Sequence, residues 1–118
     1  MAALRCLLVD DNEAFLASAT RLLERQGLRV VGRATSSADA MRLASSLLPD
    51  VILVDVQLGV EDGLELTRRL VADHEEIRVV LISTHTSDDL AELVAEAPAV
   101  GFLPKTKLSS AAIVELLG

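Results

Sequence analysis

Short apolar runs recur along the chain at fairly even spacing, and most of them are continuous rather than alternating. Several contain β-branched residues, which is typical of strands that are buried on both faces of a parallel sheet. The pattern predicts five strands, at Cys6–Val9, Leu28–Val31, Val51–Val54, Val79–Ile82 and Val100–Leu103.

Stretches of about ten to fifteen residues with helical periodicity separate these runs, which is the usual length of a crossover between parallel strands. Gly27 is a stop signal for the first helix, and Ser36 and Pro49 bound the second. The fourth helix has its start signal at Thr86-Ser87-Asp88-Asp89. The predicted helices are Asn12–Gln26, the segment between Ser36 and Pro49, Leu64–Ala72, Leu90–Ala97 and Lys107–Leu117.

Five strands that alternate with five helices predict an α/β fold of the (βα)5 type, a doubly wound parallel sheet with right-handed crossovers. The length of 118 residues fits one domain over residues 1–118, since single cores are typically about 100–150 residues long. The second strand runs into Gly32-Arg33-Ala34 and carries no candidate site residue at its end. A strand at the outer edge of the sheet need not carry a site residue. The second strand is such an outer strand in the order 2-1-3-4-5, so this order is favoured.

Composition narrows the classes of partner. Eighteen acidic against eleven basic residues give a net charge of −7, which argues against a nucleic-acid surface because phosphate binding needs a basic patch. Only Phe15 and Phe102 are aromatic, so the core must be aliphatic and base-stacking platforms are excluded. No apolar run approaches the roughly 20 residues of a membrane span, and the N-terminus turns acidic too early for a signal peptide. We therefore expect a cytoplasmic domain without membrane contact.

Polar residues follow four of the five predicted strands. Asp10 and Asp11 follow the first, Asp55 the third, Ser83 the fourth and Lys105 the fifth. Ligands of an open parallel sheet bind beyond the carboxyl ends of the strands, so we expect these residues to lie together. Three close carboxylates repel one another, and a divalent cation such as Mg²⁺ would relieve that repulsion. A lysine and a hydroxyl opposite the metal would complete a cradle for a phosphoryl group.

Five segments carry recognisable motifs: Leu7–Asn12, Pro49–Asp55, Asp62-Gly63, Val79–Ser83 and Gly101–Lys105. In this order and at these spacings they resemble the receiver domain of two-component response regulators over essentially the whole chain. The resemblance implies the flavodoxin-like receiver fold and a switch controlled by phosphorylation. Two segments, Leu28–Ala34 and Gly101–Lys105, look most like regulators with a helix-turn-helix, so the implied output is transcription through a DNA-binding domain outside this chain.

The resemblance also implies roles for the acidic residues. Asp55 would be the phosphoacceptor, attacking a phosphohistidine on a sensor histidine kinase. Asp11 and Asp55 would bind Mg²⁺ directly, and the backbone carbonyl of Gln57 would be a third protein ligand. Asp10 would act mostly through a metal-bound water. No enzyme activity is implied other than the domain's own Mg²⁺-dependent phosphorylation and dephosphorylation.

Three further positions would complete the switch. Ser83 would donate its hydroxyl to a phosphoryl oxygen, and Lys105 would pair with the phosphoryl charge. Phe102 stands where the family places an aromatic residue that swings inward on activation, coupled to the movement of Ser83. The activated domain is expected to form a homodimer or to bind its output partner more tightly.

The chain departs from the family pattern at three positions. Gly59 stands where proline is usual after the phosphoacceptor, which predicts a more mobile loop. Thr84 follows Ser83 where alanine or glycine is commoner, and its bulk would restrict access to the phosphoryl group. Pro104 precedes the lysine instead of following it, which suits an edge strand.

Other interpretations stay open at this point. A pseudo-receiver would use the same fold as an interaction module without accepting phosphate. A hydrolase with an aspartyl-phosphate intermediate would need a second carboxylate where Gln57 stands, and a flavin-binding protein would need a hydroxyl-rich phosphate loop after the first strand. Taken alone, Asp11-Asn12 could simply cap the first helix, and Lys105 could be a surface lysine.

Overall fold

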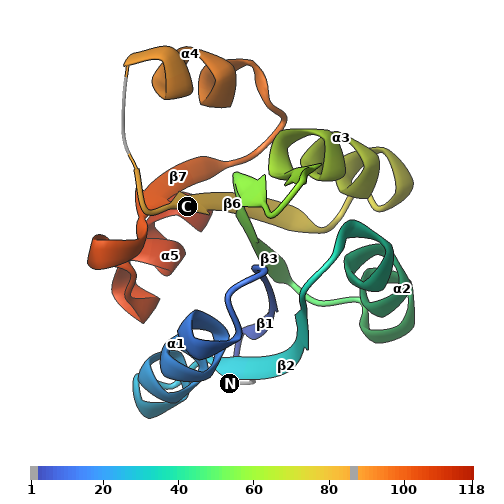
Figure 1. Ribbon diagram of the computed structural model, residues 1–118. Coiled ribbons are helices and arrows are strands. Elements are labelled where there is room, and N and C mark those ends of the chain that lie inside the picture. The colour runs from blue at the N-terminus through green and yellow to red at the C-terminus, as the bar shows by residue number, and fades with distance from the viewer. Residues whose placement is uncertain (1–2, 86–87) are drawn as a thin grey trace.

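A computed structural model describes residues 3–85 and 88–118. Its central sheet holds five parallel strands in the order β2-β1-β3-β6-β7 (Figure 1). Two short strands, β4 and β5, form a separate hairpin, so this order is the predicted 2-1-3-4-5 of the main strands. The main strands are β1 (Arg5–Val9), β2 (Arg29–Ala34), β3 (Val51–Asp55), β6 (Arg78–Ser83) and β7 (Gly101–Pro104).

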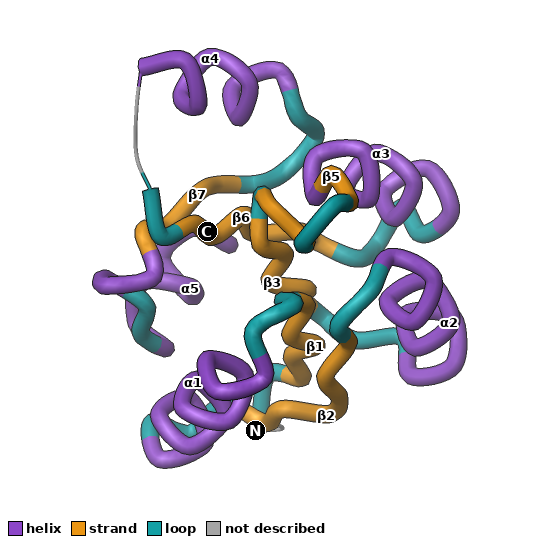
Figure 2. The backbone as a smooth tube through the Cα atoms, viewed as in Figure 1, coloured by secondary structure: helices purple, strands orange, loops and turns teal. Residues whose placement is uncertain are grey.

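Helices cover both faces of this sheet, as the predicted doubly wound fold requires (Figure 2). One face is covered by α1 (Glu13–Arg25) and α5 (Ser110–Leu117). The other is covered by α2 (Ser37–Leu47), α3 (Gly63–Asp73) and α4 (Asp88–Glu96). The carboxyl ends of the strands therefore form an edge between two helical layers.

The continuous apolar runs are explained by the two faces, because alternate side chains of each strand enter different core clusters. Leu7 and Val9 pack toward α2 and α3, whereas Cys6 and Leu8 pack toward α1 and α5. All four are at most 1% exposed. Burying a side chain of leucine or valine contributes about 1.5–3 kcal/mol, so this aliphatic core holds the strand ends in place.

Local signals in the sequence account for the helix ends. Asn12 is the N-cap of α1 and accepts a hydrogen bond from the amide of Phe15. Ser36 caps α2 in the same way, and Gly27 adopts a φ of 96° just after α1. The predicted start signal of α4 includes Thr86-Ser87, which lie outside the described residues.

The last helix differs from the prediction. The predicted helix began at Lys107, but Lys105–Lys107 form a short 3₁₀ turn, η1, and α5 begins only at Ser110. Leu108 has an extended backbone, and the side chain of Ser109 accepts a hydrogen bond from the amide of Ala112. This cap starts the helix after the apolar pattern has already begun.

A hairpin between β3 and α3 was not predicted. It consists of β4 (Gln57–Leu58) and β5 (Glu61–Asp62), which pair antiparallel. Its turn uses Gly59, whose φ of 61° a proline could not adopt. Glu61 Oε1 accepts a hydrogen bond from the Ser37 amide at 2.9 Å, which ties the hairpin to the start of α2.

Strand β7 lies at the edge of the sheet, as the prediction for Pro104 required. Pro104 is in register with Ser83 of β6, and its missing N–H removes no bond to a further strand. Within the residues that the structure describes, the helices are all too short or too polar to cross a membrane.

Candidate functional site

The carboxyl ends of β1, β3, β6 and β7 meet at an open cavity of about 280 Å³. Six predicted site residues line it together with both loop residues that depart from the family pattern, Gly59 and Thr84. The six are Asp10, Asp11, Asp55, Gln57, Ser83 and Lys105. The strand ends therefore bring carboxylates, a hydroxyl and an amine to one place, as the spacing of the motifs predicts.

Asp10 and Asp55 are held by their own loops in the same way. Asp10 Oδ1 accepts a hydrogen bond from the amide of Asn12 at 2.9 Å, and Asp55 Oδ1 accepts one from the amide of Gln57 at 3.0 Å. In each case the donor lies two residues further along the chain. One oxygen of each carboxylate is thus fixed by the backbone, and Oδ2 of each faces Lys105.

Lys105 bridges the two carboxylates. Its Nζ lies 2.5 Å from Asp10 Oδ2 and 3.0 Å from Asp55 Oδ2. The side chain of Lys105 is 12% exposed and that of Asp55 is 9% exposed, while Asp10 is fully buried. A lysine that is placed between two carboxylates in this way is not the ordinary surface residue that its sequence position alone would allow.

The electrostatics of the site follow from this burial. Burial raises the pKa of Asp10 above its usual 3.8, helped by the charge of Asp55 and opposed by Lys105 and the Asn12 amide. Burial would lower the pKa of Lys105, but its contacts with Asp10 and Asp55 outweigh that effect and raise it. The Lys105 ammonium therefore stays charged. The unfavourable electrostatic free energy of the site comes from burying the charged carboxylate of Asp10.

Asp10, Asp11 and Asp55 form a cluster that could hold a metal ion. Each offers one carboxylate oxygen, and these oxygens lie within 4.8 Å of one another. Asp10 Oδ2 is buried and accepts no well-formed hydrogen bond from the described residues. One ammonium against three carboxylates leaves about two negative charges, so this donor set fits a hard divalent cation.

Two glycines allow the backbone to pass close to the acidic residues, Gly63 beside the main chain of Asp55 and Gly59 beside the carboxylate of Asp11. A Cβ on Gly63 would lie 1.9 Å from the carbonyl oxygen of Asp55, so α3 can start against this loop only with glycine. The Gly63 amide donates to the Val56 carbonyl at 2.9 Å. A Cβ on Gly59 would lie 3.4 Å from Asp11 Oδ2, so the hairpin turn passes close to the third carboxylate.

Ser83 lies at the end of β6 and is 6% exposed. Its Oγ accepts a hydrogen bond from the amide of His85 at 3.1 Å, which holds the next residues in a turn. A hydroxyl that accepts one bond can still donate its own hydrogen, so Ser83 remains able to donate into the cavity. Thr84 is exposed on the rim beside it.

Phe102 lies away from the cavity lining found among the described residues. It is half-buried on β7, in register with Leu81. It packs against the core cluster on the side of α3 and α4, where Leu90 and Val94 of α4 also pack. Phe102 and α4 therefore share one core cluster.

Sequence reasoning missed one residue at the site, Phe15. Its ring centroid lies 4.3 Å from Lys105 Nζ. Phe15 was not among the predicted site residues and stood out only as one of the two aromatic residues of the chain. Its position could have indicated a role at the site. It lies only four residues after Asp11, and the chain has only two aromatic residues.

The comparisons with known proteins agree with this geometry. The family model of the response regulator receiver domain matches residues 6–117. The chain belongs to the response regulator receiver domain family. A curated relative, the response regulator GacA of Pseudomonas viridiflava, is 37% identical over 103 residues, covering 86% of this chain and 48% of GacA. This receiver domain thus spans about half the length of the curated relatives that it matches.

Solved structures confirm the fold. The signal receiver domain of the response regulator NarL from Mycobacterium tuberculosis superposes with a TM-score of 0.87 at 30% identity, covering 100% of this chain and 99% of that one. A response regulator from Burkholderia pseudomallei, solved with a phosphorylated aspartic acid and a calcium ion, has a TM-score of 0.84 at 29% identity, covering 98% of this chain and 66% of that one. Both confirm the predicted receiver fold.

Proposed function

We propose that this receiver domain accepts a phosphoryl group on Asp55 from a phosphohistidine of a sensor histidine kinase. The observation that carries the proposal is the position of Asp55. Its carboxylate is buried at the floor of an open, polar cavity, with one oxygen held by the Gln57 amide and the other by Lys105. A carboxylate held in this way is oriented before a phosphoryl donor arrives, and orientation is a large part of catalysis in phosphoryl transfer.

Mg²⁺ is the proposed metal, because three carboxylates with hard oxygen donors fit it. Asp11 and Asp55 would hold it directly with the backbone carbonyl of Gln57, and Asp10 would hold it through a water. When bound, Mg²⁺ supplies positive charge that balances the phosphoryl oxygens during transfer.

The transfer itself is a simple displacement. A carboxylate oxygen of Asp55 forms the new O–P bond, the N–P bond of the phosphohistidine breaks, and the imidazole leaves with that electron pair. Ser83 donates its hydroxyl to a phosphoryl oxygen, and Lys105 pairs with the phosphoryl charge. The same residues would assist the later hydrolysis of the acyl phosphate, so the domain catalyses only its own modification.

Acetyl phosphate tests the proposal without the cognate kinase. Incubation of the domain with acetyl phosphate and Mg²⁺ should add one phosphoryl group to the intact mass, and hydroxylamine should remove it. Asp55→Asn should show no gain, because an amide is a poor nucleophile, while its melting temperature shows that it folds. An unmodified wild type would contradict phosphorylation and favour the pseudo-receiver, an interaction module that takes no phosphate.

The proposed output is a change at the surface formed by α4, β7 and α5. Movement of Ser83 toward the phosphoryl group would free space that Phe102 can fill, since Phe102 packs half-buried in the cluster that α4 also enters. Burial of the ring would favour the activated state by up to about 1.5–3 kcal/mol. The equilibrium between two packings is thereby shifted by phosphate.

The regulator's output is proposed to be transcription, through a DNA-binding domain separate from this acidic receiver, in the cytoplasm. The curated relatives are about twice as long as the matched region, which supports a second domain in this regulator too. Beryllofluoride with Mg²⁺ should increase homodimer formation of the receiver in sedimentation experiments, and Phe102→Ala should reduce the increase. Equal association with and without beryllofluoride would exclude dimerisation as the output of this domain.

A further inference from the structure

The Lys105 ammonium has a third contact, with the face of an aromatic ring. Phe15, in the first turn of α1, places its ring centroid 4.3 Å from Nζ. A cation within about 6 Å of a ring centroid is attracted by the negative face of the ring, most strongly where water is excluded. Lys105 is only 12% exposed, so this contact is largely shielded from solvent.

The ring is held by the same loop that holds Asp10. The Asn12 side chain accepts a hydrogen bond from the Phe15 amide at 3.1 Å, and the Asn12 amide donates to Asp10 Oδ1 at 2.9 Å. The buried carboxylate and the aromatic ring are therefore fixed relative to each other. Lys105, which directly follows β7, contacts both of them.

Packing alone does not require an aromatic residue at this position. The buried face of α1 consists of Leu16, Ala19 and Leu23, and Phe15 lies half-buried beside it. The chain has two phenylalanines, no tyrosine and no tryptophan, and the rest of its core is aliphatic. A leucine would fill similar space, but only a ring offers an electrostatic partner to the ammonium.

We propose that Phe15 is a positioning residue that holds the Lys105 ammonium over the cavity through its ring. This inference rests on the proposed function, since it gives Lys105 its place beside the phosphoryl group on Asp55. Lysine has a long, flexible side chain, and binding of a cation or phosphoryl group would weaken its present hold on the carboxylates. The ring competes with neither, so Lys105 keeps one partner throughout.

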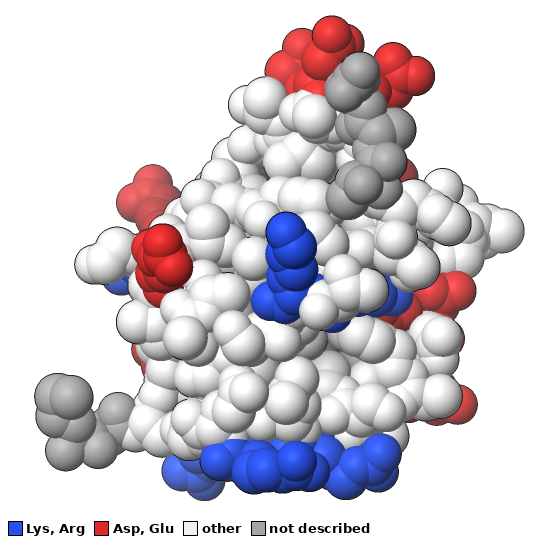
Figure 3. All heavy atoms as spheres, turned by 90° about the vertical axis from the view of Figure 1, so that its left-hand side faces the viewer, with Lys and Arg blue, Asp and Glu red and all other residues white. Residues whose placement is uncertain are grey.

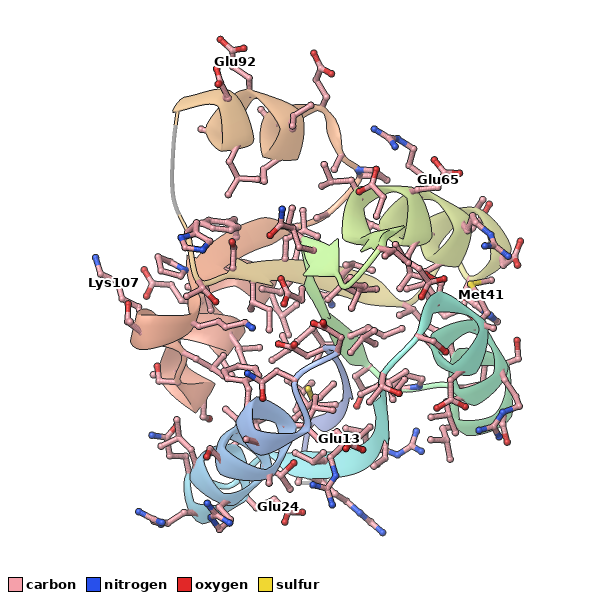
Figure 4. All side chains as sticks on the ribbon, viewed as in Figure 1. Glu13, Glu24, Met41, Glu65, Glu92 and Lys107 are labelled. Atoms are coloured by element: carbon pink, nitrogen blue, oxygen red, sulfur yellow. The ribbon has the colours of Figure 1, made fainter. Side chains whose placement is uncertain are left out.

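The position of the ammonium can be measured without metal or phosphate. The chain has two lysines, so selective ¹³C labelling gives two ε-methylene signals, and Lys107 points outward as an internal reference (Figure 4). The ring current of Phe15 should move the Lys105 proton signals upfield of those of Lys107. Phe15→Leu should abolish the difference, Phe15→Tyr should keep it, and Phe102→Leu should leave it unchanged. If the Lys105 signal keeps the same chemical shift in Phe15→Leu, the proposal is overturned.

The phosphorylation rate tests the role of this contact. With acetyl phosphate and Mg²⁺, Phe15→Leu should react about two- to tenfold more slowly than wild type, and Phe15→Tyr should restore the rate. Melting temperatures show whether either variant has lost its fold. An unchanged rate in Phe15→Leu would refute the positioning role even if the NMR difference disappears. A wild type that takes no phosphoryl group refutes the proposed function instead, and the NMR comparison then decides alone whether Phe15 holds Lys105.

Discussion

Two carboxylates and one lysine dominate the site at the scale of single residues. Asp10 and Asp55 each give one oxygen to a backbone amide two residues away and the other to Lys105. The site is therefore organised before any ligand binds. The residue whose charged form is least favourable in this arrangement is Asp10, which is fully buried and whose pKa is raised by that burial.

Asp10 should make the metal-free protein less stable as the pH rises. Burial raises its pKa above 3.8, so the folded state binds this proton more tightly than the unfolded state. The contribution to stability is complete below about pH 4 and is lost as the pH rises through the folded pKa. Urea denaturation in EDTA should show a weaker decline in stability for Asp10→Asn than for wild type as the pH rises above about 4. Equal slopes would mean that Asp10 does not titrate as its burial requires.

The sequence could predict which residues meet at the site but not how they touch. The positions of Asp10, Asp55, Ser83 and Lys105 follow from strand ends, which the apolar runs reveal directly. The contact between Phe15 and Lys105 depends on the rotation of α1 over the sheet. That rotation is set by packing of the whole face, and the local pattern does not contain it.

At the scale of elements, the loop after β3 is shaped by contacts rather than by propensity. Its hairpin strands are two residues long, too short to show any periodicity. Gly59 makes the turn with a positive φ, and Glu61 fastens the hairpin to the Ser37 amide. This is why the sequence revealed the departure at Gly59 without revealing the hairpin that needs it.

Gly63→Ala should destabilise the domain, although the loss of backbone flexibility in the unfolded chain would by itself stabilise it. The new Cβ would lie 1.9 Å from the Asp55 carbonyl oxygen, so either α3 or the Asp55 loop must move. Overpacking of this kind costs about 1–3 kcal/mol or more, measurable by urea denaturation. Gly32→Ala is the matched control, because its Cβ would meet side-chain methyls instead of backbone, those of Leu47 at 3.0 Å and of Leu7 at 3.3 Å. An equal loss in both variants would show that the backbone contact is not the cause.

At the scale of the whole molecule, charge is unevenly distributed. Figure 3 shows acidic side chains at the end of the molecule formed by α4 and basic ones gathered at the opposite end. Exposed Asp89, Glu92 and Glu96 lie on α4, and the exposed arginines of α1 and β2 are Arg21, Arg25, Arg29 and Arg33. Binding of an oppositely charged partner at either end should therefore weaken as salt is added.

Mg²⁺ should stabilise the entire domain, because the unfolded chain does not bring the three carboxylates together. At a concentration one hundred times its Kd the gain is about 2.7 kcal/mol. Calorimetry is the suitable method, because the chain has no tryptophan or tyrosine whose fluorescence could report unfolding. Asp11→Ala should lose most of the rise in melting temperature, and Glu24→Ala, an exposed position on α1, should keep it. If Asp11→Ala keeps the full rise, Asp11 is not a ligand.

The most direct test is to identify the residue that carries the phosphoryl group. Borohydride reduces an acyl phosphate on aspartate to homoserine, which is stable and can be located by peptide mass spectrometry. After incubation with acetyl phosphate and Mg²⁺, we expect homoserine at residue 55 and unmodified aspartate at residues 10 and 11. Homoserine at residue 10 or 11, or at no residue, would contradict it.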